Sequence, residues 1–335
     1  MTFNLETLEK RKPVVDLNQY QFTFYGSAGI GKTSVAGNFF EEPLFLAFEK
    51  GQNALEAYVI DIYTWKDMLQ FVKQAKKMKK EGKEFQFKNI IVDTADIMRD
   101  KCEDYVCMMN GWESPADGNM GDGWKAVRKE FEDRVSDLMG LGLMVHFIAH
   151  DKVKNIKRKD IEDYDKITLQ LGSSAINSVI KRPDFVLYFD KEFSKDADGN
   201  VSSKRVVRLD GGENYEAKSR ITGLPPVIDC GETAEETAKI LRTIFTDKLK
   251  EWQENGGKAT KKATKKQEEP IEVKKTEVSK KELEELNDLA LQAVKDKKFS
   301  MDDIVKLLKE HTSVDRIMEI EKEEEYTSLL KAIRG

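Results

Sequence analysis

Several sequence features that would directly indicate a class of function are scarce or missing. The 335 residues include three cysteines, Cys102, Cys107 and Cys230, an odd number without metal-site spacing. This is typical of ordinary thiols in a reducing compartment. No apolar run reaches the roughly 18 residues of a spanning helix, and Met1 to Val15 has no apolar stretch of the signal-peptide kind. We therefore expect a cytoplasmic protein with no membrane partner.

An excess of positive charge is also missing. The chain has 56 Lys and Arg residues against 61 Asp and Glu residues, a net charge of −5. Any contact with nucleic acid must therefore use a local basic patch rather than bulk charge. Hydrophobic residues make up 39% and charged residues 35%, which suffices for one large core and suggests that part of the chain is linker or tail.

The apolar pattern predicts alternating strands and helices from Tyr20 to about Ile180. We expect strands at Tyr20–Tyr25, Pro43–Phe48, Asn89–Val92 and Leu143–Ala149. We expect helices at Lys32–Phe40, Trp65–Lys80, Ala95–Met109 and Gly123–Leu138. This alternation is typical of an α/β fold with a mostly parallel sheet that helices cover on both faces.

The pattern changes in the second half of the chain. Asp184–Asp190 and Lys204–Leu209 are predicted to form a hairpin with a longer loop, and a capping box of Thr233 and Glu236 begins a helix that runs to Trp252. Asn255–Lys281 carries nine lysines and no aromatic residue, which predicts a basic, disordered linker. The amphipathic residues beyond it predict a small helical module. The expected domains are thus 1–253, 254–281 and 282–335.

A glycine-rich segment carries the clearest chemical signal. Gly26-Ser27-Ala28-Gly29-Ile30-Gly31-Lys32-Thr33, followed by Ser34, fits the P-loop pattern GxxxxGK[ST] between a strand and a helix. Its backbone N–H groups would hold the phosphates of ATP, Lys32 would reach the β- and γ-phosphates, and Thr33 would bind Mg²⁺. The flanking strand and helix argue against a chance glycine-rich turn.

Two carboxylates follow strands on the same expected edge. Asp93 ends a buried strand and is a candidate Mg²⁺ ligand; the alternative is a simple helix cap. Thr94 follows it, where ATPases with consecutive Asp-Glu carry the base. Glu49 ends the preceding strand and is therefore the candidate base, unless it is an ordinary surface glutamate.

In this order of motifs the chain resembles the RecA-like ATPase core, and more closely the phage P-loop proteins of the Sak-type group. These are AAA-family ATPases of single-strand annealing and recombination. The resemblance covers about Tyr20 to Gly223. It implies a RecA-like P-loop NTPase core that includes the hairpin, ATP hydrolysis with Mg²⁺, single-stranded DNA as partner and, for a phage protein, the bacterial host cytoplasm.

The resemblance also assigns a sensor to the next strand. His150 ends Leu143–Ala149, where RecA-like proteins commonly have a glutamine that senses the γ-phosphate. An imidazole leaves this role open, and a buried, hydrogen-bonded histidine is the alternative.

Two segments are candidates for DNA contact. The residues after His150 correspond to a DNA-contacting loop of the family, with five cations that would neutralise phosphates: Lys152, Lys154, Lys157, Arg158 and Lys159. The alternative is a solvated loop balanced by nearby acids. Trp112, in the glycine-rich segment Asn110–Gly123, would stack on an unpaired base, or would instead pack beneath its loop.

Lys218-Ser219-Arg220 resembles the K-x-R signature of RadA- and DnaB-type cores, in which the cations reach the nucleotide of a neighbouring subunit. A basic pair at a strand end is the alternative. The resemblance thus implies a DNA-stimulated ATPase that forms a filament or ring, with the helical module as a possible recruiter of a single-strand-binding protein. A small-molecule (nucleotide) kinase and a non-catalytic, nucleotide-switched loader are the competing functions.

Overall fold

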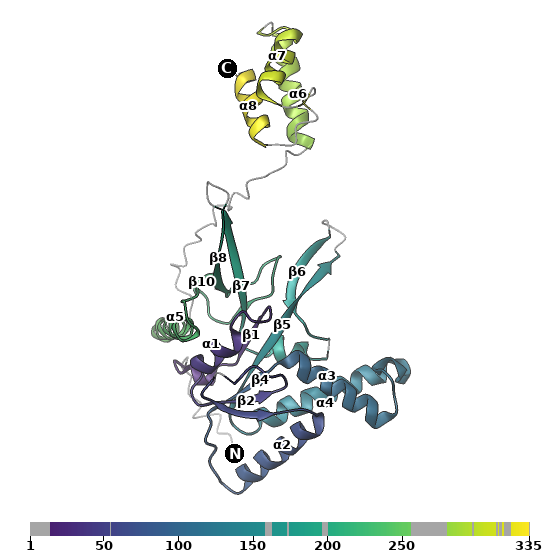
Figure 1. Cartoon of the computed structure of the whole chain (residues 1–335), viewed down its shortest axis with the longest axis vertical. Helices are drawn as coiled ribbons and strands as arrows, with labels where there is room; N and C mark the ends of the chain where they lie inside the picture. Colours follow the sequence, from purple (N-terminus) through teal and green to yellow (C-terminus); the bar gives the residue numbers. More distant parts are fainter. Residues whose placement is uncertain are drawn as a thin grey trace, which may run out of the picture. The chain divides into compact units, whose positions relative to one another are not determined.

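A sheet through the centre of the chain's first unit organises the fold (Figure 1). The computed structural model describes residues 14–53, 55–157, 163–172, 174–195, 200–255, 280–296, 298–312, 314, 317 and 323–334. The chain divides into two compact units, Met1–Lys261 and Lys262–Gly335. Within the described residues the sheet has ten strands in the order β10-β8-β7-β1-β5-β4-β2-β3, with β6 paired to β5 and β9 paired to β7.

Six neighbouring strands of this sheet run parallel, which confirms the predicted α/β class. They are β1 (Phe22–Gly26), β2 (Pro43–Ala47), β3 (Tyr58–Asp61), β4 (Asn89–Asp93), β5 (Met144–Ile156) and β7 (Phe185–Lys195). Parallel neighbours need crossover connections. Helices lie in the connections from β1 to β2, from β3 to β4 and from β4 to β5: α1 (Lys32–Phe39), α2 (Trp65–Lys80), α3 (Ala95–Asn110) and α4 (Asp122–Met139). The predicted bounds of these helices differ from the observed ones by at most one residue.

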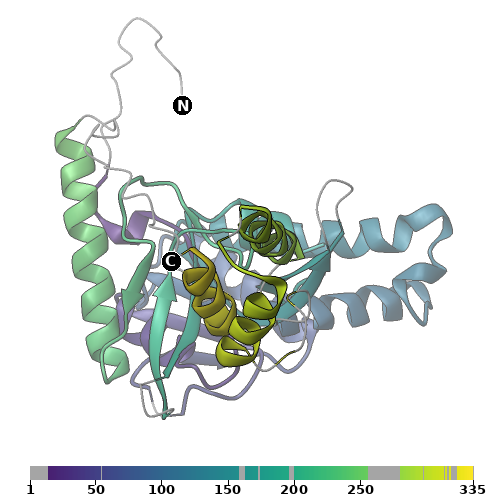
Figure 2. The same ribbon diagram turned by 90° about the horizontal axis from the view of Figure 1, so that it is seen from above.

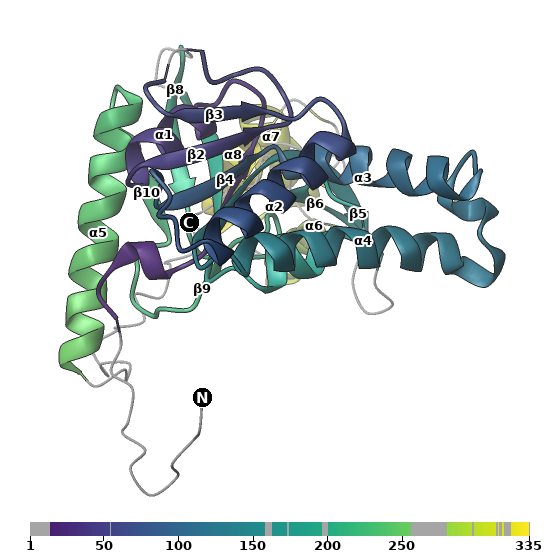
Figure 3. The same ribbon diagram turned by 90° about the horizontal axis from the view of Figure 1, so that it is seen from below.

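Helices cover both faces of the sheet because the strands are apolar on both sides. In β1, Phe22 and Phe24 join one core cluster and Tyr25 joins the other. The first cluster lies beneath α1 and α5 (Ala234–Glu254), and the second lies beneath α2, α3 and α4. Figure 3 shows α5 beside the sheet, and Figures 2 and 3 show the connected ends of α3 and α4 extending away from it.

The basic segment after His150 is a strand, where we expected a loop. β5 continues through Ile156 and pairs antiparallel with β6 (Tyr164–Leu169), so that Lys154 faces Lys166 and Val153 faces Ile167. Lys152 and Lys154 alternate with Val153, which is the period of two that strands prefer. The density of charge concealed this pattern in the sequence.

The predicted hairpin is confirmed, with longer strands than expected. β7 pairs antiparallel with β8 (Val201–Arg208) from Tyr188–Arg208 to Lys195–Val201. The short strands β3, β9 (Lys218–Ser219) and β10 (Val227–Asp229) were not predicted, because two to four residues carry too little periodicity. The capping box of Thr233 and Glu236 begins α5 as predicted.

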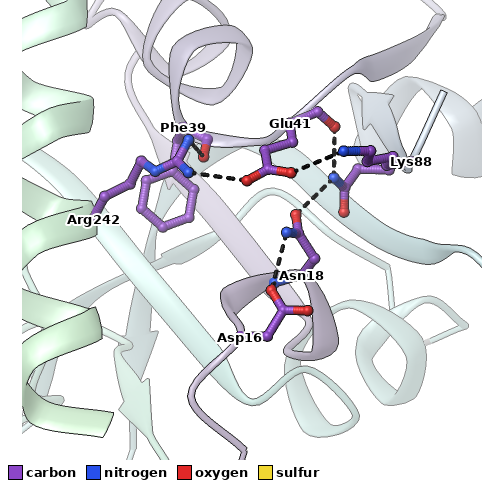
Figure 4. A network of polar contacts seen from close by, with 7 residues as sticks. Asp16, Asn18, Phe39, Glu41, Lys88 and Arg242 are labelled. Atoms are coloured by element: carbon purple, nitrogen blue, oxygen red, sulfur yellow. Dashed lines mark hydrogen bonds and ion pairs between the residues drawn. The ribbon is translucent and has the colours of Figure 1, made fainter. Parts of the chain in front are cut away.

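A polar network closes the amino-terminal edge of the sheet (Figure 4). The Glu41 carboxylate lies 3.4 Å from Arg242 of α5 and 3.2 Å from Lys88, and Arg242 also donates to the Phe39 carbonyl oxygen. Asn89 of β4 donates to Asn18 of the 3-10 helix η2 (Leu17–Gln19). These contacts connect the end of α1 with α5 and the start of β4 with η2, all at the amino-terminal edge of the sheet. The candidate site lies at the opposite, carboxyl-terminal edge.

The second unit contains the predicted helical module. Its described helices are α6 (Lys280–Lys295), α7 (Met301–His311) and α8 (Glu323–Arg334), packed around Leu286, Leu308 and Leu329. A capping box of Ser300 and Asp303 begins α7. The predicted linker falls mainly on 256–279, outside the described residues. Among the helices described in either unit, none has the length and apolar character that a membrane crossing needs.

Candidate nucleotide-binding and hydrolysis site

Three glycines shape the loop between β1 and α1. Gly26, Gly29 and Gly31 have φ angles of 150°, 74° and 106°, a region that side chains other than glycine rarely adopt. A Cβ atom at Gly26 would lie 2.3 Å from the carbonyl oxygen of Phe189. The loop therefore depends on glycine, and its exposed residues Ser27 to Gly29 present backbone at the amino end of α1. Such a helix end favours bound phosphate.

Lys32 lies where the P-loop motif predicts. Its Nζ donates to the carbonyl oxygens of Gly26 at 2.7 Å and Ser27 at 2.9 Å, and burial lowers its pKa. Four carboxylates oppose that shift: Asp151, Asp93, Glu49 and Asp96. The ammonium thus stays within the loop and is surrounded by anionic groups. The phosphates of a nucleotide would offer it charged partners in place of the two carbonyls.

Asp93 and Thr33 fit a magnesium site. The Thr33 hydroxyl donates to Asp93 Oδ2 at 3.0 Å, whereas Asp93 Oδ1 is buried without a hydrogen-bond partner. Burial raises the pKa of Asp93, whereas the hydrogen bonds from Gln52 and Thr33 and the charge of Lys32 lower it. No group of three or more protein ligands capable of holding a metal occurs among the described residues. Mg²⁺ needs few protein ligands, because phosphates and waters supply the rest.

Glu49, His150 and Asp96 form a connected group beside this pair. His150 Nε2 lies 3.9 Å from Glu49 Oε1, and His150 Nδ1 lies 2.8 Å from Asp96 Oδ2. Burial raises the pKa of Glu49, while His150 lowers it. Glu49 and His150 therefore share the carboxyl-terminal edge with Asp93, as their strand ends predicted. A carboxylate in such surroundings is suited to accept a proton.

Three residues of this site were not assigned from the sequence. Asp96 is one of them: its buried carboxylate accepts from both the backbone N–H and the ring of His150. Gln52, also buried, donates to Asp93 Oδ2 at 2.7 Å. The spacing of Asp96 three residues after Asp93, in the first turn of the helix, could have suggested its place. Gln52 lies in an irregular segment and gave no such signal.

Arg205 of β8 is the third unassigned residue. Its Nη2 donates to the Glu232 carbonyl oxygen at 2.6 Å, and its Nη1 would lie 3.7 Å from a Cβ atom at Gly31. The guanidinium is therefore fixed on one side and faces the P-loop on the other. A lone arginine in a hairpin strand has no sequence pattern that marks it. Only the pairing of β7 with β8 places it beside the loop.

Three of the cations proposed for DNA contact lie in or directly after β5. Lys152, Lys154 and Lys157 are exposed, and Lys152 Nζ donates to the Leu171 carbonyl oxygen at 3.1 Å. Arg158 and Lys159 lie outside the described residues. The exposed lysines extend from the same strand that holds His150, so one element joins both groups.

Trp112 packs against the core beneath its loop, which was the alternative to stacking on a base. It follows α3, is half-buried and packs against the core beneath α2, α3 and α4. The segment from Asp104 to Trp124 contains acidic residues and no lysine or arginine, which opposes contact with phosphates. Stacking of Trp112 on a base stays a prediction.

Lys218 and Arg220 lie near the start of β7, at the opposite edge of the sheet from the P-loop. Lys218 Nζ donates to the carbonyl oxygens of Lys181 and Pro183, each at 2.6 Å, and Arg220 Nε lies 3.1 Å from Asp184 Oδ1. The structure therefore does not bring them to the P-loop of their own chain. A role at the nucleotide requires a neighbouring subunit.

This combination of P-loop, parallel sheet and acidic strand ends defines a P-loop NTPase fold of the α/β class. The sequence matches the family described as "AAA domain" over residues 18–221. The chain belongs to this family, and its first unit is a P-loop ATPase domain.

One curated relative and two solved structures give the wider comparison. The "SPbeta prophage-derived uncharacterized protein YorG" of Bacillus subtilis (strain 168) is 32% identical over 188 residues, 52% of this chain and 58% of the relative. The chain therefore matches little more than half the length of that protein. A KaiC-like protein of Pyrococcus horikoshii OT3 has a TM-score of 0.35 at 10% identity, covering 65% of this chain and 88% of its own. The ATPase DotB of Legionella pneumophila has a TM-score of 0.24 at 9% identity, covering 73% and 56%.

Proposed function

We propose that this chain is a phage ATPase that binds single-stranded DNA and acts in recombination, as an annealing protein, recombinase or mediator. The observation that carries the proposal is the continuity of β5. This strand places His150 beside Glu49 and then extends, without interruption, into the exposed Lys152 and Lys154. The prophage origin of the relative supports the phage context.

The proposed chemistry is hydrolysis of ATP. The P-loop amides and Lys32 would hold the β- and γ-phosphates. Glu49 would orient a water molecule and accept its proton as the water attacks the γ-phosphate. Thr33 and Asp93 would hold Mg²⁺, which neutralises phosphate charge when bound. His150, oriented by Asp96, would donate a hydrogen bond toward the γ-phosphate.

Coupling to DNA would follow from the same strand. His150 lies in β5, and the Gln170 N–H, directly after β6, donates to the His150 carbonyl oxygen at 2.7 Å, so both strands of the β5–β6 hairpin are joined to the sensor at their base. A shift of His150 on loss of the γ-phosphate would therefore move Lys152 and Lys154 with it. Hydrolysis would change the grip on DNA phosphates.

The active form would be a filament or ring. Lys218 and Arg220 lie away from their own P-loop, so charge stabilisation by them at a nucleotide requires the next subunit. The helical module would recruit a partner such as a single-strand-binding protein, and the host cytoplasm would be the place of action. These parts of the proposal follow from the family resemblance.

The decisive experiment measures steady-state ATP hydrolysis by the full chain with Mg²⁺, alone and with single-stranded or duplex DNA. We expect turnover to rise with single-stranded DNA, and this rise to be lost in Lys152→Gln/Lys154→Gln while basal turnover persists. Turnover that ignores DNA would contradict the proposal. Phosphate transfer to a small acceptor would favour a kinase, and nucleotide binding without turnover would favour a loader.

A further inference from the structure

The β7–β8 hairpin has two chemically different faces. Residues directly opposite each other in an antiparallel pair point to the same side. Lys191 pairs with Arg205, Phe193 with Ser203, and Lys195 with Val201. Alternation along the strands therefore puts these six residues on one side, which we call the basic face. Among the described residues of both strands, the basic face carries three cations and no carboxylate.

The carboxylates of the hairpin lie on the opposite face and are already paired. Asp190 Oδ2 lies 2.9 Å from Arg208 Nε, and Glu192 Oε2 lies 3.2 Å from Lys204 Nζ. Lys204 also lies 2.8 Å from Asp229. This face is therefore neutralised within the chain. The connection 196–199, which includes Asp196 and Asp198, lies outside the described residues.

The outer part of the basic face is open to solvent. Phe193 is 67% exposed and Val201 is 63% exposed. Lys191 and Lys195 are exposed as well, and no ion pair that the described residues form involves their ammonium groups. The exposed Phe193 ring lies between two lysines, and burying it would be favourable because apolar surface is removed from water. This pattern is typical of a surface that a ligand covers.

The position of the hairpin connects it with the site. The β7–β8 and β5–β6 hairpins both project from the carboxyl-terminal edge of the sheet, on the side where β1 ends in the P-loop (Figure 1). β7 and β5 are the two neighbours of β1. At the base of the basic face, Arg205 faces Gly31 of the P-loop. The basic face therefore begins at the nucleotide site and leads away from it.

We propose that the basic face is a second contact surface for single-stranded DNA, in addition to the lysines of β5; this inference rests on the proposed function. Lys191 and Lys195 contact backbone phosphates, and the ring of Phe193 stacks on an unpaired base. Cations interleaved with an exposed aromatic ring are the combination that single-strand binding uses. Duplex DNA does not satisfy it, because its bases are already stacked.

The size of the effect follows from counterion release. For single strands, the slope of log affinity against log salt concentration is about −0.7 for each phosphate contact. Removing the two lysine charges should therefore make the slope shallower by about 1.4. Loss of base stacking should weaken binding by about 5-fold or more and leave the slope unchanged. Measuring DNA affinity over a range of salt concentrations therefore distinguishes the loss of phosphate contacts from the loss of stacking.

The experiment uses the full chain with Mg²⁺ and a non-hydrolysable ATP analogue. A labelled oligothymidylate of about 30 nucleotides serves as the probe, since it exceeds the usual site of roughly 4–16 nucleotides. The test variants are Lys191→Gln/Lys195→Gln and Phe193→Ala. Lys204→Gln on the opposite face is the matched control, and Lys152→Gln/Lys154→Gln tests the proposed function separately. Circular dichroism and ATP-analogue affinity verify that each variant is folded.

We expect the lysine variant to show a salt slope shallower by about 1.4, Phe193→Ala to lose affinity, and Lys204→Gln to bind as the unchanged chain does. If the β5 variant loses binding while both test variants retain it, the inference is wrong and the proposed function stands. An equal loss in Lys204→Gln would also overturn the inference, because the effect would not belong to one face. If the unchanged chain binds no single-stranded DNA, the inference and the proposed function fail together.

Discussion

Asp96 holds His150 through two contacts: its Oδ2 lies 2.8 Å from the ring Nδ1, and its Oδ1 accepts from the backbone N–H at 3.2 Å. Asp96 belongs to the first turn of α3, whereas His150 belongs to β5. The contact therefore fixes both the ring and the backbone of the sensor. With Nδ1 facing a carboxylate, Nε2 is the nitrogen directed toward Glu49.

Asp96→Asn should reduce turnover and leave nucleotide binding largely intact. The amide keeps the shape but loses the charge that orients the imidazole, so we expect kcat to fall by about 10-fold to 100-fold, the usual cost of removing a residue that orients a ligand. The KM for ATP should change little. Asp100→Asn, on the exposed side of the same helix, is the control. A fall in ATP affinity equal to the fall in kcat would contradict a positioning role.

Glu49→Gln tests the base. Gln cannot accept a proton, so kcat should fall by at least about 100-fold, whereas the affinity for an ATP analogue, measured by calorimetry, should stay near that of the unchanged chain. Glu41→Gln, at the opposite edge of the sheet, is the control for loss of a carboxylate. Near-normal turnover in Glu49→Gln would exclude Glu49 as the base.

Arg205→Met should weaken the binding of nucleotide. The fixed guanidinium faces the P-loop at Gly31, and a hydrogen bond to a charged group contributes about 1.5–3 kcal/mol. We expect the Kd for ATP to rise by about 10-fold or more, with partial recovery in Arg205→Lys. The adjacent Lys204→Met, on the other face of β8, should bind ATP normally. Equal Kd values for both variants would show that Arg205 does not contact the nucleotide.

Arg220→Ala tests action between subunits. The side chain pairs with Asp184 far from its own P-loop, so its removal should lower turnover without weakening nucleotide binding. A P-loop variant, Lys32→Ala, should be inactive for a different reason. Mixing the two variants should give more activity than the sum of the two alone, because some interfaces then combine an intact P-loop with an intact Arg220. Absence of complementation in a mixed oligomer would argue against this role.

His146 should make the fold sensitive to acid. It is buried in β5, accepts from the Phe22 N–H and contacts Asn89, and burial lowers its pKa from 6.5 to about 3. The unfolded chain therefore binds a proton first, and stability present above pH 6.5 declines as the pH falls toward 3. From pH 7 to pH 5 this group should cost about 2 kcal/mol. Urea unfolding of His146→Gln should show a shallower decline over this range. An equal decline in both proteins would mean that other groups cause it.

Long, strongly periodic elements were predictable, and irregular ones were not. Trp65–Lys80 was placed with both ends correct, because a continuous apolar stripe marks it. β3 was missed because its four residues are all exposed and carry no pattern of burial. The basic strand of β5 was taken for a loop, since charge outweighed its alternation. In each case the error reflects a local signal that was weak or masked by composition.

Some residues of the candidate site were likewise predictable from the sequence, and others were not. Lys32 and Thr33 belong to one short segment. Glu49, Asp93 and His150 each lie at or just beyond the end of the parallel pairing of their strands, so this pairing alone brings them to one edge. Three further residues reach the site only through the direction of their side chains and the register between strands: Asp96, Gln52 and Arg205. A short stretch of sequence does not allow either property to be predicted.

The sequence by itself determined the phosphate loop, the parallel sheet and the edge on which the site lies, because backbone geometry near glycines and the period of apolar residues are local properties. The tertiary structure alone decided that Asp96 orients His150, that Arg205 faces the P-loop, and that one face of the β7–β8 hairpin carries three cations and no carboxylate among its described residues. These relationships join residues from different elements. They depend on the packing that brings distant segments of the chain into contact.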